Sequence, residues 1–176
     1  MPDTNHLGRN HFELLGLPVA YSIDALSLER GYRDLQSRVH PDKFAAATEP
    51  ERRVAMQWAA QANEAYRTLR NPVERARYLL ALKGFDTEEE SNTAMPADFL
   101  MAQMELREEL EDAVDSESGA KLASVRDKLQ GGRGALLLEI EAQLGARAWN
   151  EAAGTLRRLM FMEKLGEEIA AAEDDL

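Results

Sequence analysis

The stretch "RVHPDKF", residues 38–44, places a histidine, a proline and an aspartate in a row between two amphipathic segments. Proline fixes its own φ angle and pushes the residue before it out of the helical region, so a helix that reaches this point ends at His40. The stretch therefore connects two helices. It can be an ordinary turn, a piece of acid/base machinery, or a contact for another protein.

Both segments beside this stretch show the apolar spacing of amphipathic helices. Asp24 is a suitable N-cap for the first helix, and Thr48 with Glu51 three residues later forms a capping box for the second. The apolar residues at helical spacing are Leu28, Tyr32, Leu35 and Val39 in the first helix and Val54, Trp58, Ala62, Ala65, Tyr66 and Leu69 in the second. The pattern predicts an antiparallel helical hairpin.

Two shorter helices flank this hairpin. "NHFELLGL", residues 10–17, predicts an opening helix that a glycine and a following proline stop. Asn71 and Pro72 are a natural cap and first-turn pair for a helix that ends at Gly84. The N-terminal region is therefore predicted to be a helical hairpin with short flanking helices.

The chain changes character after Gly84. "FDTEEESNTAMPAD", residues 85–98, is polar and acidic and contains a proline, which is typical of a linker. The sequence therefore predicts an N-terminal domain over residues 1–84, a linker over 85–97 and a C-terminal domain over 98–176.

The C-terminal domain contains three further helical segments, at roughly 98–115, 118–146 and 149–172. "GGRG", residues 131–134, predicts a kink or a break in the middle segment. Three amphipathic helices joined by short loops predict a small antiparallel bundle. No segment shows a sustained strand alternation, so the predicted fold class is all-α.

Composition argues against several classes of function. The net charge of −11 makes nucleic acid an unsuitable main partner, because duplex binding depends on Lys and Arg side chains that neutralise phosphates. The chain has no cysteine, so it forms no disulfide, holds no zinc through thiolates and ligates no iron–sulfur cluster in the usual way. We see neither a signal peptide nor an apolar run of membrane-spanning length, so we expect a cytoplasmic protein.

The acid/base interpretation of the opening stretch needs more than a histidine near an aspartate. His40 and Asp42 could do acid/base work, but catalysis also needs a pocket, a nucleophile or metal, and groups that stabilise charge. His6 and His11 lie near the N-terminus and suggest no ligand set. We therefore expect no enzyme activity, no metal site and no cofactor.

Three motifs together carry a resemblance. "HFELLGL" at 11–17, "YRDLQSRVHPDKF" at 32–44 and "ANEAYRTLRNPVERARY" at 62–78 resemble, in order and spacing, the J domain of DnaJ-type co-chaperones. The resemblance implies that the His-Pro-Asp turn and the basic face of the helix before it bind a heat-shock ATPase chaperone and stimulate its ATP hydrolysis. The residues implied in this contact are Tyr32, Arg33, Arg38, His40, Pro41, Asp42 and Lys43.

The physics of the turn also suits a contact. A turn fixed by proline presents charged side chains at little ordering cost, and a basic face favours an acidic partner. We therefore expect the chaperone contact to weaken as salt rises. Glu29 and Asp34 reduce the positive charge of this helix. The reduction concerns how tightly the chaperone binds and not whether it binds.

The first helix of the C-terminal domain has more apolar residues than a core face needs. With successive residues about 100° apart, Phe99, Leu106, Leu110 and Ala113 form a sufficient core side. The opposite side holds Leu100, Met101 and Met104 together with Glu105, Glu108 and Asp112. An exposed apolar stripe edged by carboxylates is a plausible protein-binding surface, although the apolar members could instead pack on another helix. In the last helix, "LMFM" at 159–162 covers nearly all directions, so at least one residue faces outward.

A second resemblance covers the C-terminal half. "FLMAQMELREELED" at 99–112 and "LRRLMFMEKL" at 156–165 resemble the C-terminal domain of HscB, the J-type co-chaperone of iron–sulfur cluster assembly. "VERARYLLALKGFDTEE" at 73–89 extends the resemblance through nearly the whole chain. The cysteine-bearing zinc module of eukaryotic relatives is absent, which points to a bacterial form. The implied patch for the scaffold protein IscU is Leu100, Met101, Met104, Glu105, Glu108, Asp112 and Phe161.

The two resemblances together imply a protein that holds two partners, an HscA-type ATPase chaperone on the N-terminal domain and an IscU-type scaffold on the C-terminal domain. Two alternatives stay open. A general J-type co-chaperone would bind unfolded polypeptides in place of the scaffold. An acid/base enzyme would need a substrate pocket near His40.

Overall fold

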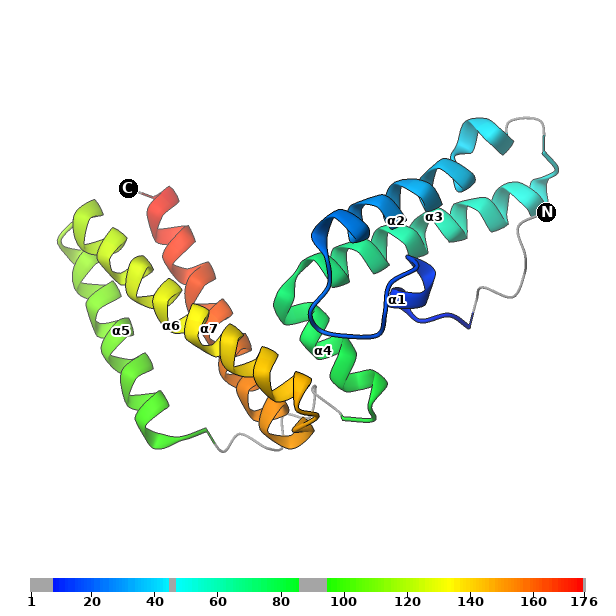
Figure 1. Cartoon of the computed structure of the whole chain (residues 1–176). Helices are drawn as coiled ribbons and strands as arrows, with labels where there is room; N and C mark the ends of the chain where they lie inside the picture. Colours follow the sequence, from blue (N-terminus) through cyan, green and yellow to red (C-terminus); the bar gives the residue numbers. More distant parts are fainter. Residues whose placement is uncertain (1–7, 45–46, 86–94, 176) are drawn as a thin grey trace. The chain divides into compact units, whose positions relative to one another are not determined.

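The computed structural model of the chain describes residues 8–44, 47–85 and 95–175. Within these ranges every regular element is a helix, so the prediction of an all-α fold is confirmed (Figure 1). Contacts between Cα atoms divide the chain into two compact units, Met1–Leu79 and Leu80–Leu176.

The N-terminal unit is built on a helical hairpin. Its elements are α1 (His11–Leu14), α2 (Ala25–Val39), the 3₁₀ helix η2 (Pro41–Phe44), α3 (Glu49–Arg70) and most of α4 (Pro72–Leu82). Helices α2 and α3 lie side by side, and η2 follows α2 (Figure 1). The predicted hairpin with short flanking helices is therefore confirmed.

The caps of the hairpin lie where the sequence predicts them. The Ser27 amide donates a hydrogen bond to the Asp24 carboxylate at 2.8 Å, and the Thr48 amide donates to Glu51 at 2.8 Å. Hydrogen bonds from Ser27 and Thr48 lower the pKa of Asp24 and Glu51, respectively. An ionised acceptor beside free amides at the start of a helix also meets the positive end of its dipole, so these caps fix where α2 and α3 begin.

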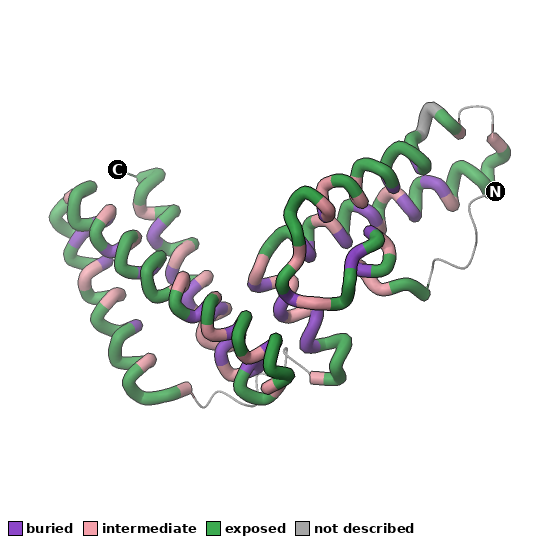
Figure 2. The backbone as a smooth tube through the Cα atoms, in the orientation of Figure 1, coloured by how far each residue is buried: buried purple, intermediate pink, exposed green. Residues whose placement is uncertain are grey.

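The core of the N-terminal unit lies between α1, α2, α3 and α4. Its buried apolar side chains include Phe12, Leu28, Leu35, Val39, Trp58, Ala62, Ala65, Leu69 and Val73. Buried positions recur at intervals along α3 and are not continuous, as expected of an amphipathic helix (Figure 2). Val54, Tyr32 and Tyr66, which the pattern also places on the core stripe, are only half-buried.

Gly31 marks a close approach between α2 and the turn that follows α1. A methyl group at Gly31 would collide with the carbonyl oxygen of Leu15, which is backbone and cannot turn aside. Glycine is needed here for space and not for an unusual backbone angle.

The C-terminal unit contains a three-helix bundle of α5 (Ala97–Asp115), α6 (Gly119–Gly145) and α7 (Trp149–Asp174). These bounds agree with the predicted segments to within two residues. Helices α6 and α7 pack most extensively on each other, and α5 packs on both (Figure 1). The buried side chains include Leu122, Val125, Leu129, Leu136, Ile140, Leu144, Leu156, Leu159, Met162, Leu165 and Ile169.

The predicted break at residues 131–134 is wrong, because α6 continues through them. Gly132 faces α7 closely enough that a methyl group there would stand 3.0 Å from the Met162 Cε atom. Leu129 and Leu136, on either side of the glycines, are both buried. Packing against α7 therefore keeps the segment helical despite the low helix propensity of glycine.

Ion pairs join the three helices of the bundle. They are Arg107–Glu168 (2.8 Å), Lys121–Asp112 (2.7 Å), Lys128–Glu109 (2.6 Å), Arg126–Glu173 (2.7 Å), Arg133–Glu163 (3.4 Å) and Arg158–Glu139 (2.6 Å). Both partners are half-buried in Arg133–Glu163 and Arg158–Glu139, and each of the other four pairs has at least one exposed partner. An exposed pair contributes at most about 1 kcal/mol. The apolar core therefore dominates the stability of the bundle, and the pairs help to fix how its helices align.

The expected linker over 85–97 falls largely on residues 86–94, which lie outside the described part of the chain. The domain division at residues 84 and 98 therefore stays a prediction. In the described ranges, no helix combines the length and the apolar character needed to cross a membrane.

Candidate protein-binding surfaces

The His-Pro-Asp stretch lies where α2 meets η2. His40 leaves the helical conformation, with φ −59° and ψ 132°, and its carbonyl accepts a hydrogen bond from the Lys43 amide at 3.0 Å. The side chains of His40 and Lys43 are exposed. Pro41 and Asp42 lie in η2, and their side chains fall outside the described part of the structure.

The outer face of α2 carries the other basic residues. Arg33 and Arg38 are both exposed, as the sequence predicts for a contact surface. Because successive helical residues are about 100° apart, the two arginines flank a strip that also contains Arg30 and Asp34. Arg30 is exposed as well, and sequence reasoning missed it although the same helical spacing could have found it.

Tyr32 faces α3 more than it faces outward. Its ring stacks on that of Tyr66 with 4.2 Å between centroids and 18° between planes. Its hydroxyl donates to the Asn63 amide oxygen at 2.8 Å and accepts from the Gln36 amide at 2.6 Å. The half-buried Tyr32 is thus held by both helices of the hairpin.

Glu29 links the same two helices. Its carboxylate accepts from the Tyr66 hydroxyl at 2.7 Å and from Arg33 Nε at 2.8 Å. These bonds, first from Tyr66 and then from Arg33, lower the pKa of Glu29, and the bond to Glu29 raises the pKa of Tyr66. Arg33 therefore has an acidic partner within its own chain, which sequence reasoning did not predict.

The first helix of the bundle has the two faces that its sequence predicts. Leu110 and Ala113 are buried, Phe99 and Leu106 are half-buried, and the core side also includes the buried Gln103. The opposite side is exposed. Its members are Leu100 (38% exposed), Met101 (63%) and Met104 (63%), together with the exposed acids Glu105, Glu108 and Asp112.

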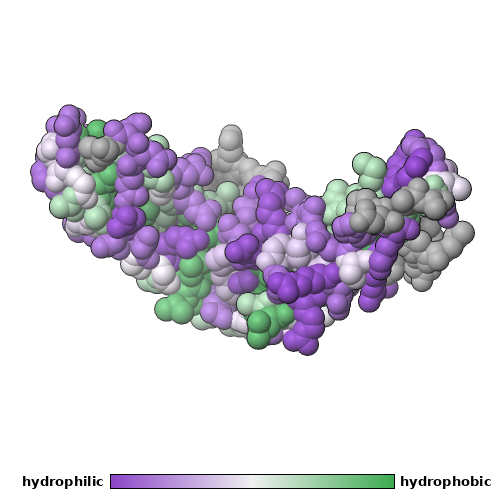
Figure 3. Space-filling model, turned by 90° about the horizontal axis from the view of Figure 1, so that it is seen from above, coloured by the Kyte–Doolittle hydropathy of each residue, from purple (hydrophilic) through white to green (hydrophobic). Residues whose placement is uncertain are grey.

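We call these six residues, Leu100, Met101, Met104, Glu105, Glu108 and Asp112, the α5 patch. The alternative that its apolar members pack on another helix of the bundle is wrong for Met101 and Met104, which are mostly exposed. In the space-filling view most of the visible surface is hydrophilic, and hydrophobic side chains form only small groups on it (Figure 3). Among the exposed large apolar side chains of the described residues, Leu100, Met101 and Met104 lie within about one turn of a single helix.

Phe161 is placed differently from the α5 patch. It is half-buried on α7, and its ring meets the ring of Phe99 edge-on with 6.0 Å between centroids. The Arg107 guanidinium lies 5.7 Å from the Phe161 centroid and also donates to Glu168 at 2.8 Å. Phe161 thus packs between α5 and α7 and keeps only part of its surface for a partner.

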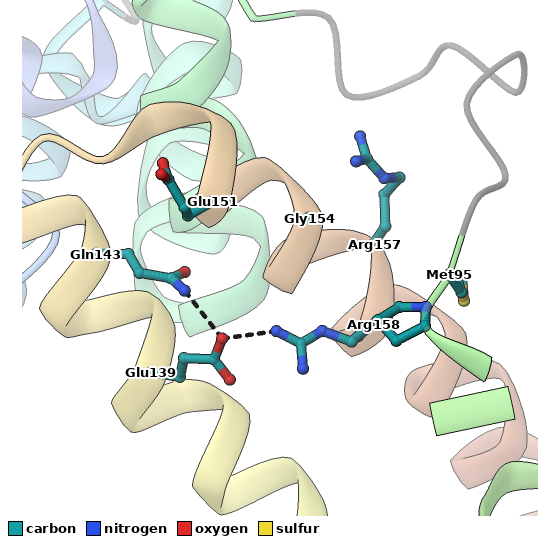
Figure 4. A pocket seen from close by; sticks show the side chains of 8 residues that line it. Met95, Glu139, Gln143, Glu151, Gly154, Arg157 and Arg158 are labelled. Atoms are coloured by element: carbon teal, nitrogen blue, oxygen red, sulfur yellow. Dashed lines mark hydrogen bonds and ion pairs between the residues drawn. The ribbon is translucent and has the colours of Figure 1, made fainter. Parts of the chain in front are cut away.

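A cavity of about 350 Å³ opens in the C-terminal unit between α6 and the start of α7 (Figure 4). Its lining residues are Met95, Pro96, Glu139, Gln143, Glu151, Gly154, Arg157 and Arg158. Glu139 accepts hydrogen bonds from Arg158 at 2.6 Å, from Gln143 at 2.9 Å and from the buried Thr155 at 3.0 Å.

Burial of Glu139 raises its pKa, but the bonds from Arg158, Thr155 and Gln143 outweigh this effect and hold the pKa below its usual value. A carboxylate whose ionised form is stabilised in this way is a weak proton acceptor. The cluster is therefore a structural connection between α6 and α7. Within the described ranges, no three His, Asp or Glu side chains are placed to hold a metal ion.

Comparisons with known proteins cover most of the chain and agree with one another. A family model described as the HSCB C-terminal oligomerisation domain matches residues 95–170. Two relatives named co-chaperone protein HscB homolog are each 48% identical to the chain. The relative from Burkholderia thailandensis aligns over 162 residues, 92% of this chain and 93% of its own. The relative from Cupriavidus taiwanensis aligns over 165 residues, 94% of each chain.

Solved structures give the same picture. Chaperone HscB from Vibrio cholerae superposes with a TM-score of 0.83 at 41% identity, over 96% of this chain and 99% of the other. Human co-chaperone protein HscB superposes with a TM-score of 0.90 at 26% identity, over 99% of this chain and 86% of the other. The resemblance found in the sequence is therefore confirmed at the level of the fold.

Proposed function

This chain belongs to the HscB family of co-chaperones, and we propose that it stimulates the ATPase of an HscA-type chaperone and delivers an IscU-type iron–sulfur scaffold to it. A co-chaperone acts through a chaperone partner and is not itself an enzyme. The further proposal is that this occurs in the bacterial cytoplasm and assists the maturation or transfer of iron–sulfur clusters.

The observation that carries the proposal is the α5 patch. Leu100, Met101 and Met104 are apolar side chains that the bundle core leaves exposed, and carboxylates border them. Methionine adapts its shape to a partner surface, so the patch suits a folded protein with an apolar contact and nearby cations. We assign the scaffold contact to Leu100, Met101, Met104, Glu105, Glu108, Asp112 and the exposed part of Phe161.

The chaperone contact is assigned to the other unit. The turn at His40 and the outer face of α2 present exposed cationic side chains, which favour an acidic partner and a contact that salt weakens. We assign this contact to Tyr32, Arg33, Arg38, His40, Pro41, Asp42 and Lys43, and we add Arg30. Residues 1–84 would then form the J domain, and residues 98–176 the scaffold-binding domain.

Two binding surfaces in one chain explain how a protein that catalyses no reaction itself can accelerate the ATPase cycle of a chaperone. When one partner is bound, the second encounter takes place within one assembly, so its effective concentration rises. The scaffold would therefore reach the chaperone while the N-terminal unit triggers ATP hydrolysis. The full stimulation of ATP hydrolysis in the presence of the scaffold should therefore require both the chaperone-binding and the scaffold-binding surface.

The decisive experiment measures the steady-state ATPase rate of the cognate HscA-type chaperone with and without the scaffold. We expect the wild-type chain to stimulate the rate, the scaffold to add synergy, and the His40→Gln variant to lose stimulation. Met104→Ser, which alters only the α5 patch, should keep stimulation by the chain alone and lose the synergy. An unchanged rate with the wild-type chain would overturn the proposal.

A second candidate is a general co-chaperone that delivers unfolded clients, and the same exposed methionines favour it because they also suit varied apolar segments. The two candidates differ in what occupies the α5 patch. Competition between the scaffold and an unfolded, permanently denatured polypeptide separates them. If the polypeptide displaces the scaffold at comparable concentration, the general role is correct.

A further inference from the structure

Glu29 is an acidic side chain at the edge of a surface that is proposed to bind an acidic partner. Its two oxygens are both occupied, Oε1 by Arg33 Nε at 2.8 Å and Oε2 by the Tyr66 hydroxyl at 2.7 Å. The Arg33 and Glu29 side chains remain 76% and 38% exposed, so a partner can reach either of them. A carboxylate that pairs with Arg33 therefore comes close to the negative charge of Glu29.

Glu29 is held from α3 as well as from α2. Tyr66, which donates to it, is fixed by its stack on Tyr32 at 4.2 Å, and the Arg70 guanidinium lies 5.9 Å from the Tyr66 centroid. Tyr32 in turn bonds to Asn63. An ordinary pair between residues four apart on an exposed helix exchanges partners freely, whereas this one has a second anchor on the neighbouring helix.

We infer that Glu29 is a specificity-determining residue of the α2 face: it keeps Arg33 paired along the helix and so lowers the affinity for the acidic surface of the chaperone. The inference rests on the proposed function. A partner carboxylate that approaches Arg33 must displace Glu29 or stay near its like charge, and both weaken binding. Only a partner with enough carboxylates around this point engages Arg33 fully, so Glu29 also selects among acidic proteins.

The test uses Glu29→Gln in the full chain. Glutamine has nearly the same shape and can still accept from Tyr66, but it no longer competes as a charge for Arg33. The dissociation constant for the purified HscA-type chaperone is measured at about 50 mM and about 500 mM salt. We expect the variant to bind roughly three- to tenfold more tightly than wild type at low salt and equally at high salt.

Glu64→Gln is the matched control. Glu64 pairs with Arg67 at 2.9 Å on exposed α3, also within one helix, and neither residue belongs to the α2 face. Its neutralisation changes the net charge of the chain by the same amount. The control should bind within about twofold of wild type, because the effect of Glu29 is local and not a general effect of charge.

Arg33→Gln completes the test as a double-mutant cycle. Because Glu29 acts through Arg33, the gain from Glu29→Gln should vanish in the Arg33→Gln background. A Glu29→Gln variant that binds no more tightly than wild type at low salt, or that gains equally without Arg33, overturns the inference alone. Failure of the wild-type chain itself to bind the chaperone overturns the proposed function and this inference together.

Discussion

The Lys121 ammonium nitrogen lies 2.7 Å from the Asp112 carboxylate, and this pair joins the last turn of α5 to the first turn of α6. Asp112 is one of the three acids of the α5 patch, and its charge is already met within the chain. Among the described residues, Glu105 and Glu108 make no such ion pair. The three acids are therefore not equivalent toward a cationic partner.

We expect Glu108→Gln to weaken scaffold binding roughly three- to tenfold, because an exposed charge is lost from the contact. Asp112→Asn should stay within about twofold of wild type, since Lys121 already neutralises that carboxylate. Isothermal titration of the scaffold into each variant at low salt measures both. Equal losses for the two variants would show that the Lys121 pair opens on binding.

Met104→Ser should weaken scaffold binding about tenfold, which corresponds to part of the free energy of burying a methionine side chain. Met56→Ser on α3 is the control, because Met56 is 70% exposed and Met104 is 63% exposed. Neither variant should change the melting temperature appreciably. If both variants bind the scaffold equally well, the α5 patch is not the contact.

Gly31→Ala should destabilise the N-terminal unit by about 2 kcal/mol or more, because the new methyl group meets the Leu15 carbonyl. Gly131→Ala on α6 should instead stabilise the chain by up to about 1 kcal/mol, since a methyl group there meets nothing within 4 Å and alanine favours helix. Urea unfolding followed by circular dichroism gives both values. A neutral Gly31→Ala would mean that α1 can shift away from α2.

The stability of the N-terminal unit should fall as pH drops below about 6.5, in part because of His11. Burial lowers the pKa of His11 from its usual 6.5, while Glu64 acts in the opposite direction. The unfolded chain thus binds a proton at a higher pH than the folded chain. The folded state is therefore progressively disfavoured between pH 6.5 and the lower pKa of the folded chain, and no penalty exists above that window.

His11→Phe tests this prediction, because phenylalanine keeps a ring against Tyr78, on which His11 stacks at 4.2 Å. Thermal unfolding from neutral to mildly acidic pH should show a weaker pH dependence for this variant than for wild type. Identical slopes for wild type and His11→Phe would contradict the assignment.

Most of the fold could be predicted because the signals that define helices act over a few residues. The caps at Asp24 and Thr48 and the stop at Gly84 are local signals. In the structure α2 and α3 begin directly after the two caps, and α4 ends at Leu82, two residues before Gly84. The break predicted at residues 131–134 was wrong because helix propensity, on which the prediction rested, describes only the residues themselves and not what packs on them. What keeps α6 continuous is its packing on α7, where buried residues such as Leu129 lie beside residues far away in the sequence.

The candidate surfaces also have features that local sequence predicts and features that it does not. Helical spacing alone was enough to predict that Met101 and Met104 are exposed, because the direction of a side chain on a helix follows from its position. The pairing of Glu29 with Tyr66 depends on how two helices align, and no pattern within either helix reports it. Sequence reasoning could therefore find the surfaces but not the partners that their charges already have.

Helix α5 is anchored mainly at its C-terminal half. Leu110 and Ala113 are buried there, and its three ion pairs to the other helices start from Arg107, Glu109 and Asp112. The turns that carry the exposed apolar residues bury only Gln103 fully. Their backbone amides should therefore exchange hydrogen for deuterium faster than those around Leu110, and a bound scaffold should slow them. The apolar residues of the α5 patch thus sit on the less firmly anchored half of the helix, where binding of a partner can be measured as protection from exchange.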